Sequence, residues 1–218
     1  MDSERPAKVP CIDKAERERR LKIVKNIRRG VLPRGLMENY NDDDKEIVLA
    51  LVEREPGKLR LASERLKDDR DIVLAAVRRT TVDALSWASD RLRDDQEVVL
   101  VAVGYDAHSL KYASAEQKTD IVVVMTAVEQ SGQALQCASQ ELRNNKEVVV
   151  KAVQQNACAM GFASAEMQAD RDLVLEAIQR DGYALRFASD ELKNDLEVVR
   201  QAVRQAVRRK GRALRCIR

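Results

Sequence analysis

Few side chains in this chain could perform chemistry, and each occupies a place that unrelated residue types fill elsewhere. The single histidine, His108, stands five residues before an Ala-Ser pair, and Cys158 stands at the same place before a later pair. Before the other Ala-Ser pairs this place holds Gly57, Asp83, Gln133 and Tyr183. A catalytic base needs a fixed environment and a partner within hydrogen-bond reach. A place that accepts all of these types is typical of an exposed turn, so the sequence predicts no catalytic role for His108.

The remaining candidates for a metal site or a nucleophile are equally weak. The run from Asp42 to Asp44 lacks the glycine and the distal glutamate of a calcium loop, and a helix cap explains it better. Cys137 stands where other repeats have Trp87 or Phe162, which indicates core packing. No glycine-rich phosphate loop and no Ser/His/Asp set is present. The sequence therefore predicts a protein that is not an enzyme, with no metal, cofactor or small-molecule substrate.

The feature that positions all of these residues is a repeat. Ala-Ser pairs begin at residues 62, 88, 113, 138, 163 and 188, with spacings of 26, 25, 25, 25 and 25. Self-similarity at a fixed period of this size is typical of an array in which one small unit stacks on copies of itself. We therefore expect an all-α fold, a right-handed type of α-solenoid whose short antiparallel helices repeat every 25 residues.

Each repeat is expected to contain two or three short helices. A first helix of about ten residues, beginning near residue 70 in its unit, follows from apolar residues spaced by 3, 4 and 7. Its predicted N-caps precede a glutamate by three residues, at Asp43, Asp94, Asn144 and Asn194. A second helix leads to the Ala-Ser pair. The serine either lies inside that helix or begins a further short helical turn, and the acids that follow it favour the break.

The array is expected to occupy residues 23–218 as a single domain, with a polar N-terminal extension over residues 1–22. The clear units span residues 43–199, and the first and last units are degenerate. Near the C-terminal end the segment 201–204 is repeated as 205–208 (Gln-Ala-Val-Arg). Four added residues are just over one helical turn, so the last long helix is expected to grow while keeping its apolar face. Residues 211–216 then echo the second helix of a repeat.

The repeat resembles a known family. The segments that carry the likeness are Glu197-Val198-Val199, the run from Gly182 to Ser189, and the run from Glu191 to Asp195. They resemble the tandem repeat catalogued as domain of unknown function 4116, over about residues 43–214. The resemblance implies a helical repeat fold and carries no catalytic motif.

Aromatic residues share one place in the repeat. The residue just before each Ala-Ser pair is Leu61, Trp87, Tyr112, Cys137, Phe162 or Phe187. Exposed rings at this place would suggest platforms for stacking nucleic-acid bases. Because leucine and cysteine share the place, we instead expect a buried ladder along the axis.

Charge carries the only indication of function. The segment from residue 199 onward holds eight basic residues and no acid, the first 34 residues hold eleven basic and five acidic residues, and the middle is acidic. The expected partner-binding residues are the basic ones of the C-terminal end: Arg200, Arg204, Arg208, Arg209, Lys210, Arg212 and Arg215. Basic ends could cap the stack or dock on RNA or on an acidic protein surface.

We therefore expect a binding or scaffolding protein that presents a long face to a protein partner. The alternative is an RNA-associated accessory subunit of a ribonucleoprotein, docked through its basic ends. The four cysteines show no Cys-x-x-Cys spacing and are expected to be free thiols in a reducing intracellular compartment, with the cytoplasm as default and an organelle interior open. No run of apolar residues is long enough to span a membrane.

Overall fold

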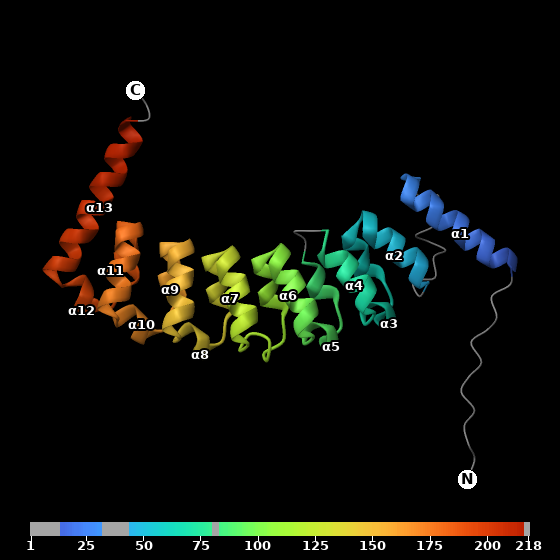
Figure 1. Cartoon of the computed structure of the whole chain (residues 1–218), viewed down its shortest axis with the longest axis horizontal. Helices are drawn as coiled ribbons and strands as arrows, with labels where there is room; N and C mark the ends of the chain where they lie inside the picture. Colours follow the sequence, from blue (N-terminus) through green and yellow to red (C-terminus); the bar gives the residue numbers. More distant parts are fainter. Residues whose placement is uncertain (1–13, 32–43, 80–82, 216–218) are drawn as a thin grey trace, which may run out of the picture.

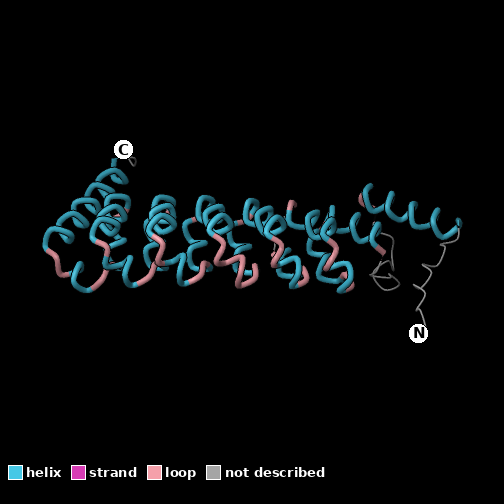
Figure 2. Tube along the Cα trace, turned by 60° about the horizontal axis from the view of Figure 1, so that its bottom comes forward, coloured by secondary structure: helices cyan, strands magenta, loops and turns pink. Residues whose placement is uncertain are grey.

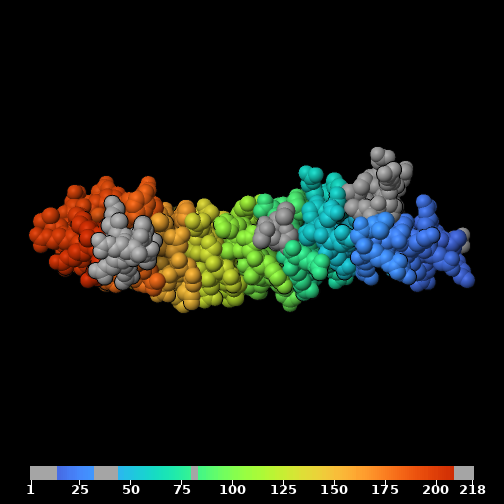
Figure 3. All heavy atoms as spheres, turned by 90° about the horizontal axis from the view of Figure 1, so that it is seen from above, coloured from blue at the N-terminus to red at the C-terminus, as the bar shows by residue number. Residues whose placement is uncertain are grey.

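The described part of the chain is a row of stacked helical repeats. The computed structural model describes residues 14–31, 44–79 and 83–215, with side chains as far as Arg208, and in these ranges it contains helices and no strand. The repeats follow one another in chain order from α1 to α13 (Figure 1) and form an elongated body (Figure 3). The prediction of an all-α fold with a 25-residue helical repeat is confirmed.

Three kinds of helix alternate along the chain. The long helices are α1 (Lys14–Arg29), α2 (Lys45–Arg54), α4 (Arg70–Val77), α6 (Gln96–Tyr105), α7 (Ile121–Gln130), α9 (Lys146–Gln155), α11 (Arg171–Arg180) and α13 (Leu196–Arg215). The 3₁₀ helices are η1 (Pro56–Leu61), η2 (Ala84–Trp87), η3 (Ala107–Tyr112), η4 (Gly132–Cys137), η5 (Ala157–Phe162) and η6 (Gly182–Phe187). The short α-helices are α3 (Glu64–Lys67), α5 (Asp90–Arg93), α8 (Gln140–Arg143), α10 (Ala165–Ala169) and α12 (Asp190–Lys193). The same loops recur between them from repeat to repeat (Figure 2).

The N-caps of the long helices lie one residue later than the sequence pattern predicted. In α6 the cap is Asp95, whose backbone is extended and whose carboxylate accepts a hydrogen bond from the Val98 amide at 3.1 Å. Asp94, the predicted cap, has φ −100° and ψ −9° and ends the preceding short helix α5. A cap needs an extended backbone for its side chain to reach the first turn, so Asp94 cannot serve. In the same way, Asn145 rather than Asn144 caps α9. Asp44 caps α2. At α13 the side chain of Asp195, rather than that of Asn194, accepts hydrogen bonds from the Glu197 and Val198 amides. Asp43 lies outside the described residues.

The serine of each Ala-Ser pair begins a new helical turn and also joins two repeats. At Ser89 the hydroxyl oxygen accepts from the Leu92 amide at 3.3 Å, which caps α5. The backbone amide of the same serine donates to the carbonyl of Lys67 in the preceding repeat at 3.0 Å. This junction bond recurs from Ser114 to Arg93, from Ser139 to Lys118, from Ser164 to Arg143 and from Ser189 to Gln168. The predicted break at serine is confirmed, although residues 115–119 form turns without an α-helix.

Three of these serines make a further bond across the junction. The hydroxyls of Ser89, Ser114 and Ser164 donate to Asp68, Asp94 and Asn144 of the preceding repeat. The bond to Ser89, followed by the contact with Arg91, lowers the pKa of Asp68. At the corresponding places before Ser139 and Ser189 the chain has Thr119 and Ala169. Asp94 and Asn144, which looked like helix caps in the sequence, are therefore acceptors for the next repeat.

Ser89 and Ser139 form a matched pair for testing this junction. Both hydroxyls cap a short helix with a bond of 3.3 Å, but only Ser89 also donates to an acid of the preceding repeat. We expect Ser139→Ala to lower the free energy of unfolding by about 0.5–2 kcal/mol, the usual value of a cap. Ser89→Ala should cost about 0.5–1.5 kcal/mol more, because a second hydrogen bond is lost. Urea denaturation followed by circular dichroism measures both, and equal losses would mean that the bond to Asp68 contributes nothing.

The second helix of each repeat is a 3₁₀ helix, whereas the sequence pattern predicted only a short helix of unspecified type. Each except η2 lies against the long helix before it and the long helix after it, and η2 lies against α4. Neighbouring 3₁₀ helices touch from η1 to η6. The core lies between this layer and the layer of long helices. Leu59, Leu85, Leu110, Leu135 and Met160 are 0% exposed and each stands three residues before a buried alanine. A spacing of three is the period of a 3₁₀ helix, in which residues i and i+3 share one side.

The two ends depart from the expected boundaries. Helix α1 begins at Lys14, inside the expected polar extension, and its residues to Lys22 are mostly exposed. Val24 and Ile27 of α1 pack on α2 in a small core of their own. At the other end, α13 runs on to Arg215, so the echo expected over residues 211–216 does not form a separate second helix. Within the described ranges, no helix is both long and apolar enough to traverse a bilayer.

Candidate interaction surfaces

The residues considered for catalysis lie apart from one another. His108 is an exposed residue of η3, and its Nδ1 lies 3.2 Å from Asp106 of the same turn. Cys158 is half-buried in η5, and Cys137 is half-buried in η4, where burial raises the pKa of its thiol. A raised pKa keeps this thiol protonated and weakly nucleophilic. Among the described residues, no three His, Cys, Asp or Glu side chains are grouped to hold a metal ion, and Asp42 and Asp43 lie outside these residues.

The aromatic row is not the buried ladder that the sequence predicted. Trp87, Tyr112, Cys137, Phe162 and Phe187 pack at the edge of the core and are half-buried, while Leu61 is 50% exposed. The ring of Phe187 lies against Gly161 of the preceding repeat, where an added Cβ would approach it to 2.7 Å. Each place is the last residue of a 3₁₀ helix, which lies at the rim between the two layers. This position explains why leucine, cysteine and aromatic residues all fit there.

Basic neighbours cover part of this aromatic row. The ammonium of Lys111 lies 4.4 Å from the centre of the Tyr112 ring, and the guanidinium of Arg186 lies 5.2 Å from the centre of the Phe187 ring. Cation–π contacts of this kind stabilise an exposed ring by about 0.5–1 kcal/mol. The rings are thus engaged within the chain, which does not favour the stacking of nucleic-acid bases on them.

A row of ion pairs joins the long helices on their outer face. The first residue of one long helix reaches the cap or first turn of the next: Lys45 Nζ lies 2.7 Å from Asp69, Lys146 Nζ lies 2.6 Å from Asp170, and Arg171 Nη2 lies 2.7 Å from Glu197. Arg70 likewise pairs with Glu97, and Arg20 of α1 begins the row at Asp44, 2.6 Å away. The bond from Lys146 is the main reason that the pKa of Asp170 is lowered. Exposed ion pairs each contribute only about 0–1 kcal/mol to the free energy of unfolding. The row therefore matters less for stability than for the regular charged surface that it forms along the long helices.

This pattern is interrupted at α6 and α7. Gln96 replaces the basic residue of α6 and bonds to Asp120 at 2.8 Å. In α7 the first two residues are Ile121 and Val122, which are 42% and 55% exposed. The place of Val122 holds an acid in the other repeats: Glu46, Asp71, Glu97, Glu147, Asp172 and Glu197. We call Ile121 and Val122 the central apolar set.

The central apolar set was not apparent from the sequence. Ile121 and Val122 continue directly into the apolar run of α7, so the sequence alone presents them as more core. In other repeats the residues corresponding to Ile121 and Val122 form exposed ion pairs, which shows that the first turn of the long helix faces solvent. Aligning the first two residues of every long helix would have given the signal.

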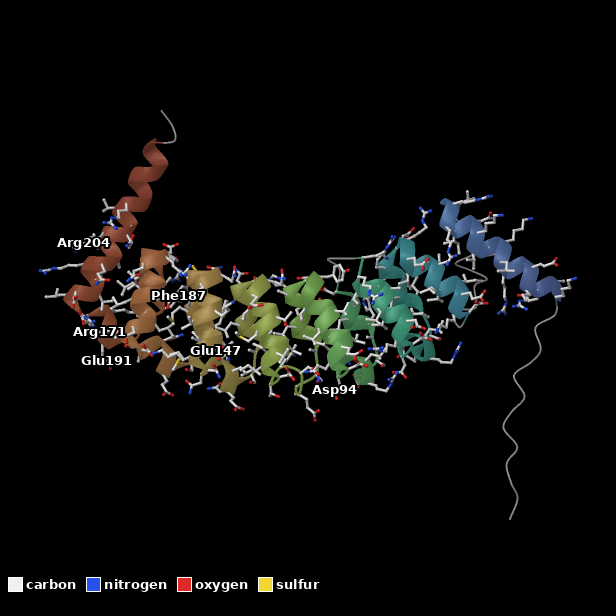
Figure 4. The ribbon with its side chains drawn as sticks, in the orientation of Figure 1. Asp94, Glu147, Arg171, Phe187, Glu191 and Arg204 are labelled. Atoms are coloured by element: carbon white, nitrogen blue, oxygen red, sulfur yellow. The ribbon has the colours of Figure 1, made fainter. Side chains whose placement is uncertain are left out.

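The predicted basic residues of the C-terminal end lie on α13. Arg200, Arg204 and Arg208 are exposed, and Arg204 points away from the neighbouring helix α11 (Figure 4). None of these three arginines has an ion pair with a described residue. The backbone of Arg209, Lys210, Arg212 and Arg215 continues α13, but their side chains lie outside the part of the chain that the structure describes. Beside the arginines, α13 exposes Leu196, Val203 and Val207 at 73%, 56% and 65%.

Fold and surfaces together define a helical repeat protein. The family model described as "Domain of unknown function (DUF4116)" matches residues 44–87, 123–168 and 170–218. The chain therefore belongs to this family, as the sequence resemblance indicated. No curated protein and no solved structure matches it.

Proposed function

We propose that this protein is a non-catalytic scaffold that holds a protein partner along the outer face of its long helices. The observation that supports the proposal most is the exposure of Ile121 and Val122 at places that are charged or polar in most other repeats. An exposed valine gains nothing for folding at such a place, whereas an acid in the first turn of a helix is stabilising. Interface cores are depleted in charge, which fits two adjacent apolar residues at places where the other long helices carry charged or polar ones.

The second candidate function is that of an RNA-associated subunit docked through the basic ends. It is supported by Arg200, Arg204 and Arg208, which have no acidic partner among the described residues. Such binding would weaken steeply as salt rises, because contacts with a polyanion release counterions. Binding through the central apolar set would change little with salt.

Val122→Glu is the variant that tests the first candidate. It restores the acid that the other repeats carry, so the free energy of unfolding should stay the same or rise by about 0.3–1 kcal/mol. The protein partner retained from native extract should fall by about tenfold or more, the effect of losing over 1 kcal/mol at an interface. Quantitative mass spectrometry of the retained proteins, with and without nuclease, measures this.

Val150→Ala in α9 is the control, because it trims a half-buried valine of the next long helix while leaving the central apolar set intact. It should retain the partner as the wild-type chain does. Equal retention by Val122→Glu would contradict the proposal, and loss of all retained material on nuclease treatment would favour the RNA-associated subunit.

The thiols bear on the compartment. Cys137 and Cys158 are both free, which supports the proposal that the protein works where thiols remain reduced.

A further inference from the structure

The outer side of α13 is a helix-packing surface that no described residue covers. Val103, Val128, Val153 and Ile178 hold one place in the inner long helices, and each has an exposed fraction of 0%. Each of these helices packs on the 3₁₀ helix that follows it and on the next long helix. Val203 holds the same place in α13 and is 56% exposed. Val199 is half-buried, whereas its counterparts Val99, Val124 and Val149 are 0% exposed. The side of α13 that corresponds to the junctions of the inner repeats is therefore open.

The extra turn of α13 lengthens this surface. The inner long helices α7, α9 and α11 have ten residues, and α13 has twenty. The repeated Gln-Ala-Val-Arg segment places Val207 one turn beyond Val203, on the same side of the helix. Leu196, seven residues before Val203, begins the same stripe. As Figure 1 shows, the C-terminal half of α13 projects past the neighbouring α11.

An arginine follows each valine of the stripe. Arg200, Arg204 and Arg208 come directly after Val199, Val203 and Val207, about 100° further around the helix. All three arginines are exposed, and no acid occurs from residue 199 to the end of the sequence. The surface thus combines an apolar stripe with one cationic flank.

We propose that this surface binds an amphipathic helix of a partner protein that carries carboxylates along one flank. A helix is the occupant because the corresponding surface of each inner repeat packs on a long helix. Carboxylates on the partner are complementary in charge to the three exposed arginines. A second copy joined end to end does not suit, because α1 exposes Lys22, Lys25, Arg28 and Arg29, so two basic surfaces would meet. RNA would engage the arginines but would leave the valine stripe in water.

This inference goes beyond the proposed function and uses a different surface. The probe is a synthetic helical peptide with leucines at the spacing of the valine stripe and a glutamate after each one. Two further probes are the same peptide with lysines for glutamates, and oligouridine. Fluorescence anisotropy with the full chain should show binding of the glutamate peptide over the lysine peptide. Val203→Asp should weaken the binding of the glutamate peptide by about tenfold or more.

Charge reversal provides the decisive arm. Arg204→Glu combined with Arg208→Glu should lose the glutamate peptide and gain the lysine peptide, while Val122→Glu should bind all probes as the wild-type chain does. Failure of the glutamate peptide to bind better than the lysine peptide would overturn the inference. The inference would also be overturned if oligouridine bound more tightly than the glutamate peptide and if Val203→Asp left the affinity for oligouridine unchanged. Neither result would contradict the proposed function, because partner retention by the central apolar set is tested separately with Val122→Glu.

Discussion

Met160→Ala is expected to lower the free energy of unfolding by about 2–5 kcal/mol, the range for truncating a large buried side chain. Met160 is 0% exposed and lies between the 3₁₀ layer and the long helices. Phe162, in the same 3₁₀ helix, is half-buried at the rim of the core. Phe162→Ala should therefore cost less than Met160→Ala, although the phenylalanine is the larger residue. Chemical denaturation followed by circular dichroism compares the two.

The comparison also decides the role of the aromatic row. If Phe162→Ala costs as much as Met160→Ala, the row is part of the core, as the sequence pattern alone would indicate. If both losses stay within about 0.5 kcal/mol, the value of an ordinary surface change, the packing described between the two layers is wrong.

Gly132→Ala is expected to lower the free energy of unfolding by about 1–3 kcal/mol, as overpacking usually does. A Cβ at Gly132 would lie 2.3 Å from the carbonyl oxygen of Ala152 in the next repeat. The backbone of the neighbour must then move, and the junction between η4 and α9 must widen. Ala107 and Ala157 hold the same place in other repeats, so the junction at Gly132 is a tighter one.

Gly104→Ala is the matched control. A Cβ there would meet no atom within 4 Å, and the residue lies within the long helix α6. Alanine at a helical position is favoured over glycine, so the variant should gain about 0.5–1 kcal/mol. Thermal unfolding of the two variants should shift in opposite directions, and a shift of Gly132→Ala to higher temperature would disprove the close approach.

The repeat and its long helices could be predicted from the sequence because they rest on periodic burial. Ala-Ser pairs and apolar spacings recur with little variation, and burial against a neighbour imposes the same types at the same places. The caps were misplaced because two polar residues adjoin, as in Asp94-Asp95. Asp95 caps α6, whereas Asp94 accepts a hydrogen bond from Ser114 of the next repeat. Because both residues are aspartates, the residue type alone does not show which of them is the cap.

The surfaces were harder to predict because their meaning depends on neighbouring repeats. Ile121 and Val122 look like core residues until Lys146 and Asp170 show that the first turn faces solvent. The arginines of α13 were visible as charge, but the exposed valines beside them were not. Val203 has the same type as the fully buried Val153, and only the lack of a covering helix among the described residues separates them.

The junction bonds of the serines have a mechanical consequence. Neighbouring repeats are joined by contacts between their long helices and between their 3₁₀ helices. A backbone hydrogen bond such as that from Ser114 to Arg93 also recurs at each junction between the Ala-Ser repeats. A pull on the two ends would be borne by the junctions in series, so the weakest would yield first while the others held. Each released unit of 25 residues would span at most about 80–90 Å when fully extended. A partner held at one end and a partner held at the middle would thus be joined by a tether that extends in steps.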